Sequence, residues 1–230
     1  MLIFPGLKEM NYRRISGALI LLLLFGAAAQ AQETNAPPES SKMFTEARQI
    51  SEGSPPAFEF ELSGFTYRIN GNGAGRRVKG EQTRRFNLRL DGGDYVERFY
   101  FAEYRDNVVL LCGVTNGESV AGFVARLEQP SMRTRWKQFI PAFNVGAGLI
   151  KDGHAYLTGI NFVARLDLRT GEYVWKHDHL ERGRGGGDFN SFEVPSIEGD
   201  AVLFREKPTG KSPARTIRVN RKTGKINGIE

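Results

Sequence analysis

The sequence contains little cysteine, tryptophan or histidine. Its 230 residues include one cysteine, two tryptophans and three histidines. A single cysteine cannot form an intramolecular disulfide, so the fold must be stabilised by a hydrophobic core. Cys112 follows the apolar run Val108–Leu111, a pattern typical of a buried strand in which a free thiol behaves as a small hydrophobic group. We therefore expect no nucleophilic or redox role for this cysteine.

Common catalytic motifs are also missing. The chain has no G-x-S-x-G sequence. Two glycine-rich stretches, Asn70–Gly75 and Gly183–Gly187, lack both the Gly-Lys-Ser/Thr continuation and the following helix that bind phosphate. We interpret both stretches as turns, and we expect the protein to be non-catalytic and without a cofactor.

One cluster, His177-Asp178-His179, is a candidate metal site. Alternate residues of a strand share a face, so both imidazoles could bind one ion, with Glu181 or Asp188 adding an oxygen ligand. The same residues follow a strand and precede the second glycine-rich stretch, which favours an exposed rim instead. An envelope enzyme with a metal centre at His177 and His179 is the alternative to a non-catalytic protein.

The N-terminal region has the pattern of a signal peptide. Basic residues at positions 8, 13 and 14 precede an uncharged run over Ile15–Gln32, and Ala29-Gln30-Ala31 fits a cleavage site. We predict that residues 1–31 are a signal peptide and that the protein is periplasmic or secreted. The alternative is an uncleaved anchor, because the uncharged run is just long enough to cross a bilayer.

The composition changes twice after this leader. Residues 32–56 are rich in proline and serine and predict a flexible tether, within which Met43–Ile50 is the one stretch that could form a short helix. From Ala57 onward, short apolar runs alternate with Gly, Asn and Asp. Phe58–Leu62 and Phe65–Ile69 alternate apolar and polar residues, as strands with one buried face do. We therefore predict a single β domain over residues 57–230.

Two segments of this domain repeat with the same offset. Phe123–Glu128 (FVARLE) recurs as Phe162–Asp167 (FVARLD) 39 residues later, and Trp136 recurs as Trp175 at that offset. Upstream, Leu110–Gly113 matches residues 156–159 at an offset of 46. Repeats of about 40 to 50 residues, each with about four strands, are typical of β-propeller blades.

Two fainter copies extend the pattern to both ends of the domain. Residues 86–91, followed by Tyr95-Val96, resemble the strand over Phe162–Asp167 and its successor. Ile217–Ile226 resembles residues 164–173 at an offset of 53. The tryptophan positions of these copies hold Glu97 and Gly228. We predict an all-β fold of propeller-like repeats, with three to four blades of short antiparallel strands.

The third repeat resembles the quinoprotein-type (PQQ-like) β-propeller family. Val163–Asp167, the Thr170-Gly171 turn and Trp175 match the family's V-Y-A-L-D strand, T-G turn and Trp-ended strand. Asp167, Thr170 and Gly171 are expected to form a hairpin turn. Trp136 and Trp175 are expected to be the anchors of the repeats, because a tryptophan buries its ring and still donates its N–H.

Repeat number separates this chain from the family's enzymes and outer-membrane-assembly scaffolds, which close with more blades than residues 57–230 can supply. The resemblance therefore implies a propeller-type scaffold without the cofactor cavity of a full ring. Three arrangements are left open: a small four-bladed ring, an open array, and a partial propeller completed by self-association. Unpaired terminal strands would be adhesive edges.

The net charge of +6 points to anionic partners. Basic clusters include Arg76-Arg77-Lys79, Arg84-Arg85 and Arg133–Lys137. Export argues against nucleic acid, so we predict a protein or an anionic envelope polymer as the partner. The competing interpretation is that these charges are solvated strand edges that discourage aggregation. The sequence thus predicts an exported, non-catalytic binding or scaffold protein of the cell envelope.

Overall fold

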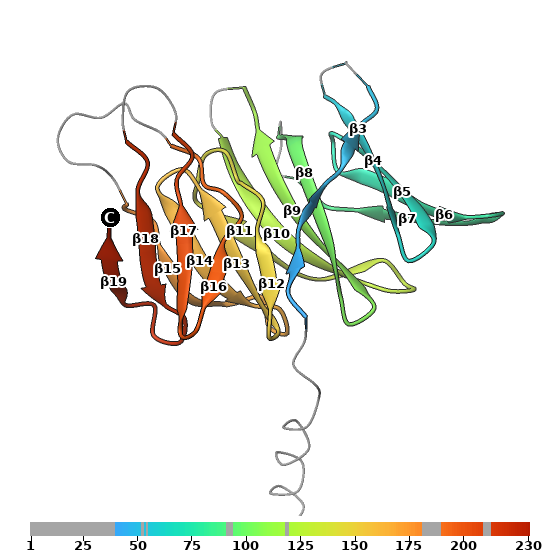
Figure 1. The fold of residues 1–230 in the computed structure, drawn as a ribbon. Coiled ribbons are helices and arrows are strands. Elements are labelled where there is room, and N and C mark those ends of the chain that lie inside the picture. The colour runs from blue at the N-terminus through green and yellow to red at the C-terminus, as the bar shows by residue number, and fades with distance from the viewer. Residues whose placement is uncertain are drawn as a thin grey trace, which may run out of the picture. The chain divides into compact units, whose positions relative to one another are not determined.

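The turn-punctuated strands of the sequence fold into antiparallel sheets (Figure 1). The computed structural model describes residues 40–51, 53, 55–90, 94–117, 120–180, 190–208 and 213–230. The predicted signal peptide lies outside the described residues. The part that is described contains no helix, and therefore none long and apolar enough to cross a membrane.

Four sheets each contain four consecutive strands, and we call them blades 1 to 4 in chain order. Blade 1 comprises β4 (Ala57–Leu62), β5 (Phe65–Asn70), β6 (Ala74–Lys79) and β7 (Gln82–Asn87). Blade 2 comprises β8 (Tyr95–Tyr104), β9 (Asn107–Thr115), β10 (Val120–Glu128) and β11 (Arg133–Ile140). Blade 3 comprises β12 (Leu149–Lys151), β13 (His154–Gly159), β14 (Phe162–Asp167) and β15 (Tyr173–His177). Blade 4 comprises β16 (Ser196–Glu198), β17 (Ala201–Arg205), β18 (Thr216–Asn220) and β19 (Ile226–Ile229).

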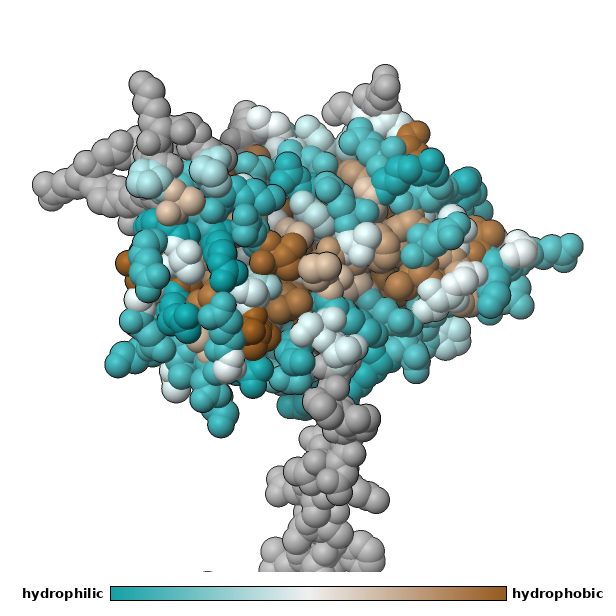
Figure 2. Space-filling view, in the orientation of Figure 1, coloured by the Kyte–Doolittle hydropathy of each residue, from teal (hydrophilic) through white to brown (hydrophobic). Residues whose placement is uncertain are grey.

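The segment Lys42–Gln49, which we call the strap, adds one short strand to each of three blades. Its strands β1 (Lys42–Met43), β2 (Thr45–Glu46) and β3 (Arg48–Gln49) pair with β12, β8 and β4, the first strands of blades 3, 2 and 1. The strap crosses the front of these blades in Figure 1, and apolar side chains gather on the same side in Figure 2.

The strap corrects the prediction from the sequence that residues 32–56 are a flexible tether in which Met43–Ile50 could form a short helix. The segment is extended because its backbone hydrogen bonds go to the edges of three blades. Phe44 and Ala47 lie between the paired residues and are buried, so every third side chain points inward. That period matches neither a helix nor a single continuous strand.

Three apolar layers hold the blades together. One layer joins blades 1 and 2 and includes Phe60, Tyr67 and Ala47 of the strap. The second joins blades 2 and 3 and includes Phe44, and the third joins blades 3 and 4. Each of the inner blades therefore buries both faces, which explains why β9 is apolar at successive positions rather than alternating.

The structure confirms the repeat, with corrections of phase. Phe123–Glu128 and Phe162–Asp167 form the third strands β10 and β14, and Ile217–Ile226 spans β18 and the start of β19. Phe123 faces Cys112, whereas Phe162 faces Gly159, so the second strands correspond at an offset of 47 rather than 46. A slip of one residue in a strand exchanges its two faces.

The first faint copy is out of phase. Phe86 lies near the end of β7, the last strand of blade 1, and Tyr95 begins β8, the first strand of blade 2. The true counterpart of β10 and β14 in blade 1 is β6, which carries arginine and glycine where the others are apolar. This loss of apolar residues hides blade 1 from a comparison of sequence repeats.

The blades form an open array rather than a closed ring. In the described part of the chain, no core cluster joins blade 1 to blade 4. Of the three arrangements left open by the sequence, the described blades do not form the small four-bladed ring, and completion by self-association stays a prediction. The face of blade 1 that points away from blade 2 is consequently not covered by another described blade.

Candidate functional site

The uncovered face of blade 1 carries a row of charged residues at one level across five strands. Pairing in register places Arg48 opposite Glu59, Glu59 opposite Arg68, Arg68 opposite Arg76, and Arg76 opposite Arg85. We call Arg48, Arg68, Arg76 and Arg85 the arginine row. All four side chains belong to exposed residues.

Strand alternation explains why the row points outward. On β5, Tyr67 and Ile69 are fully buried against blade 2, so Arg68 between them faces the opposite side. Each of the sequence pairs Arg76-Arg77 and Arg84-Arg85 likewise places one arginine on each face. Arg77 is turned inward, where its guanidinium stacks on the ring of Phe65 and donates to Gln129 of blade 2.

The electrostatics of the row are unbalanced. Glu59 accepts hydrogen bonds from Arg68, at 2.5 Å from its Nε, and from Arg48. These hydrogen bonds, first from Arg68 and then from Arg48, lower the pKa of the Glu59 carboxyl. The described residues contain no ion pair to Arg76 or Arg85. The row therefore has three more positive than negative charges.

The row replaces what is hydrophobic core in the other blades. Ala125 pairs with Leu110 in blade 2, and Ala164 pairs with Leu157 in blade 3, each facing the preceding blade. The equivalent pair in blade 1 is Arg76 and Arg68. A charged pair at this level cannot bury against another apolar sheet without a large desolvation cost.

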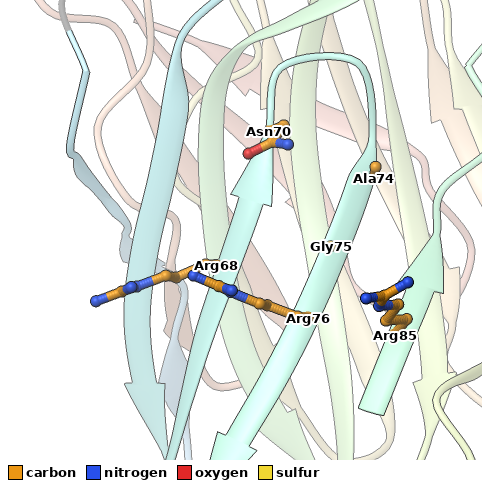
Figure 3. Close-up of a pocket in the computed structure, with 6 residues that line it drawn as sticks. All are labelled: Arg68, Asn70, Ala74, Gly75, Arg76 and Arg85. Carbon is orange, nitrogen blue, oxygen red and sulfur yellow. The ribbon is translucent and has the colours of Figure 1, made fainter. Parts of the chain in front are cut away.

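Two pockets lie along the row. The first, of about 370 Å³, is lined by Asn70, Ala74 and Gly75 together with Arg68, Arg76 and Arg85. Figure 3 shows these three arginines rising from the neighbouring strands β5, β6 and β7. The second pocket, of about 580 Å³, is lined by residues 48–51 and Arg68. Because both share Arg68, they form one continuous basic surface that a small or extended anion can reach.

Arg76 and Arg85 belong to basic clusters seen in the sequence, but sequence reasoning assigned them no site and missed Arg48 and Arg68. Arg68 is one of the polar residues of a strand that alternates apolar and polar residues, and this pattern could have indicated that its side chain faces outward. The register that brings the four together depends on pairings across the whole blade and is not visible in a single sequence.

The predicted anchors Trp136 and Trp175 lie in equivalent places between blades. Trp136 of blade 2 donates its Nε1–H to the Leu168 carbonyl of blade 3 at 3.1 Å, and Trp175 of blade 3 donates to the Arg221 carbonyl of blade 4 at 3.0 Å. Each ring packs against the turn glycine of the next blade: Trp136 packs against Gly171, and Trp175 packs against Gly224. A Cβ at Gly171 would lie 2.5 Å from the indole ring.

The predicted turn residues fix the conformation of the turn against which Trp136 packs. The Asp167 carboxylate accepts hydrogen bonds from the amides of Arg169 and Thr170, while the Thr170 hydroxyl accepts one from Glu172. Gly171 has a positive φ of 81°, which glycine adopts without strain. These residues therefore build the turn between β14 and β15 of blade 3, against which Trp136 of blade 2 packs, and they line none of the described pockets.

Arginines reinforce the same junctions, a role that sequence reasoning missed. Arg126 donates to the Leu168 carbonyl and Arg165 to the Arg221 carbonyl, each beside the corresponding tryptophan. Arg77 and Arg218 occupy the equivalent positions in blades 1 and 4. The signal was the shared arginine of the FVARLE and FVARLD hexapeptides.

The outer blades lack the tryptophan itself. Arg84 pairs with Arg77 as Trp136 pairs with Arg126, so Arg84 holds the tryptophan position of blade 1. This corrects the assignment of Glu97, which lies in β8. Gly228 pairs with Arg218 and holds the position in blade 4, as predicted from the sequence.

The candidate metal ligands His177 and His179 are not brought together on one strand. β15 ends at His177, whose Nε2 lies 2.7 Å from the Gly224 carbonyl of blade 4. His179 is exposed and lies 3.7 Å from the Asp178 carboxylate. Glu181 and Asp188 lie outside the described residues. Among the residues that the structure does describe, no group of three metal-binding side chains occurs.

Cys112 is fully buried between blades 1 and 2. Desolvation by burial raises the pKa of its thiol well above the usual value, so the reactive thiolate is suppressed. The structural position therefore agrees with a packing role.

Comparison with known proteins gives limited similarity. No protein-family model matches the sequence, and no curated protein matches it. Among solved structures, the chain is similar to the crystal structure of BamB from Moraxella catarrhalis, with a TM-score of 0.37 and 13% sequence identity. The similar region covers 80% of this chain and 67% of that chain. We therefore define the blades by the sheets, strand registers and repeated junctions of this structure, and not by that similarity.

Proposed function

We propose that this protein is an exported, non-catalytic binding protein of the cell envelope, and that it binds an anionic ligand on the outer face of blade 1. The observation that carries the proposal is the arginine row. Of its four arginines, Arg48 and Arg68 share the Glu59 carboxylate, and Arg76 and Arg85 have no described ion pair. Arginine presents several N–H donors in a fixed planar arrangement, which suits carboxylate, sulfate and phosphate groups.

Two sequence features support the remaining parts of the proposal. The signal-peptide pattern over residues 1–31 supports export to the periplasm or beyond. The quinoprotein-type pattern of blade 3 supports a scaffold built from that family's repeats, and an open array offers no central cavity for its cofactor. The proposed ligand is therefore an anionic component of the envelope, bound without chemical change.

The test is binding to a generic polyanion. Purified protein is titrated with dextran sulfate and, as a control for the polymer, with neutral dextran. We expect saturable binding to dextran sulfate that weakens as salt increases, because exposed charges are screened. The triple variant R68A/R76A/R85A is expected to bind about tenfold more weakly or worse.

A charge-matched control separates the site from net charge. The variant R133A/K222A/K225A removes three exposed basic residues outside blade 1 for which the structure describes no ion pair. It is expected to bind dextran sulfate within about twofold of the parent, as surface substitutions away from a site usually do. Equal loss in both triple variants would show that binding follows net charge and would refute the assignment of the site.

A further inference from the structure

We propose that the ligand of the arginine row is a linear acidic polysaccharide with one carboxylate on each sugar, lying across strands β5 to β7. This inference rests on the proposed function, because it specifies the anion bound there. It follows from three features of the face: the spacing of the arginines, the carboxylate already held within the row, and the uncharged residues on either side.

The first feature is spacing. Arg68, Arg76 and Arg85 lie opposite one another on successive strands, and neighbouring strands are about 5 Å apart. These three positions therefore form a line that runs across the strands. One pyranose residue of an extended polysaccharide has about the same length, so a chain lying along this line would pass about one arginine position for each sugar.

The second feature is an internal template for the ligand. The Glu59 carboxylate lies between Arg48 and Arg68 on the two flanking strands and accepts hydrogen bonds from both. Arg76 and Arg85 lie on directly paired strands, and no carboxylate of the described residues pairs with either of them. A carboxylate from the ligand placed beside them would supply the kind of contact that Glu59 makes with Arg48 and Arg68.

The third feature is the polar, uncharged surface beside the row. Asn70 and Asn87 lie one level away on one side, where Asn70 pairs with Ala57 of β4 and Asn87 pairs with Ala74 of β6. The Asn87 carbonyl oxygen accepts from the Arg89 amide, which leaves its NH₂ group as a donor. Thr66 and Thr83 flank the row on the other side, paired with Val78. Amides and hydroxyls in these positions suit the hydroxyl groups of a sugar.

The same surface disfavours single-stranded nucleic acid. The outward positions of β5, β6 and β7 hold arginine, asparagine, threonine, alanine and valine. Proteins that bind single strands generally stack the bases on aromatic side chains. The aromatic residues of these strands, including Tyr67 and Phe86, instead face blade 2.

The experiment measures affinity against chain length with oligogalacturonates of one to six residues, using purified protein and isothermal titration calorimetry at low salt. We expect affinity to rise by up to about fivefold for each residue added from one to three, as exposed ion pairs contribute modestly, and then to level off. The variant R68A/R76A/R85A should show no length dependence, whereas R133A/K222A/K225A should match the parent.

Methyl-esterified oligogalacturonate tests the role of the carboxylate, because it keeps the hydroxyls and loses the charge. Its failure to bind supports the proposal. Equal affinity for galacturonic acid monomer and trimer would overturn the linear ligand. Tighter binding of polyphosphate or of an oligonucleotide with the same number of charges would overturn the polysaccharide but leave the proposed function standing. Absence of binding to all of these and to dextran sulfate would refute both.

Discussion

The two end blades expose polar faces that differ in how their charges are balanced. On the described outer face of blade 4, Arg205 and Arg218 both pair with Glu198, at 3.2 and 3.1 Å. On blade 1, Glu59 pairs with two arginines, while Arg76 and Arg85 have no described acidic partner.

Either face could serve as a polar cap that keeps a further copy of the repeat from docking. A cap requires polarity, which both blades have, but it does not require an excess of one sign. Blade 4 shows that this chain can cap an end with paired charges. The surplus on blade 1 therefore calls for a second explanation, and anion binding supplies one.

The largest expected effect concerns how each end blade is attached. Trp175 joins blade 3 to blade 4, whereas the tryptophan position of blade 1 holds Arg84, which is exposed. Trp175→Ala should reduce the free energy of unfolding by about 3 to 5 kcal/mol. Arg84→Ala should reduce it by about 0.5 kcal/mol or less. Urea unfolding followed by circular dichroism measures both, and a Trp175→Ala protein that unfolds like the parent would refute its role as an anchor.

The next effect tests charge balance directly. Glu59→Gln removes the one carboxylate within the arginine row and should tighten dextran sulfate binding by up to about fivefold. Glu198→Gln frees two arginines on blade 4 and, in the R68A/R76A/R85A background, should restore part of the lost binding. Fluorescence anisotropy with labelled dextran sulfate compares the four proteins. If neither substitution changes affinity, charge balance is not what distinguishes the two faces.

A smaller effect depends on pH and is confined to the junction of blades 3 and 4. His154 lies beside Asp152 and Arg165, and burial lowers the pKa of its imidazole. The unfolded chain therefore binds a proton at His154 more readily than the folded chain does. The stability that neutral His154 contributes is lost as the pH falls below about 6.5.

His154→Gln should lack this component of the pH dependence. Urea unfolding midpoints are measured at pH 7.5 and 5 for the parent and the variant. The difference between the two proteins isolates the contribution of His154 from the titration of other groups. A parent and variant with identical pH dependence would show that His154 contributes none. Amide hydrogen exchange should place the loss in blade 4 rather than in blade 1.

The smallest expected change is that of Cys112, which reports on the contact between blades 1 and 2. Because burial raises the pKa of the thiol, the native protein should react with a thiol reagent such as DTNB only as it unfolds. Rapid modification without denaturant would indicate that blade 1 detaches readily.

The repeat was most evident from the sequence in blades 2 and 3, which bury both of their faces. The hexapeptides of β10 and β14 and the two tryptophans repeat because each fills the same junction. Blade 1 was placed out of phase because Arg68 and Arg76 replace core residues, so its repeat pattern is lost at the arginine row. The strap was missed because its partners lie on three different blades and only Phe44 and Ala47 point inward.

The candidate site was only partly foreseeable. The basic clusters at positions 76–77 and 84–85 are evident in the sequence, and alternation along β5 places Arg68 on a solvent face. Their alignment with Arg48 depends on four strand pairings, and whether Arg85 has an ion pair among the described residues depends on where the nearby carboxylates lie. Neither can be obtained from local pattern.

Mapping the ligand by NMR tests directly whether the anion binds to blade 1. Amide chemical shifts of labelled protein are recorded during a titration with oligogalacturonate trimer. We expect perturbations to concentrate at Arg68, Arg76, Arg85 and the flanking asparagines of β5 to β7, with blade 4 unchanged. Perturbations that centre on β16 to β19, or that spread evenly over all basic residues, would contradict binding to blade 1.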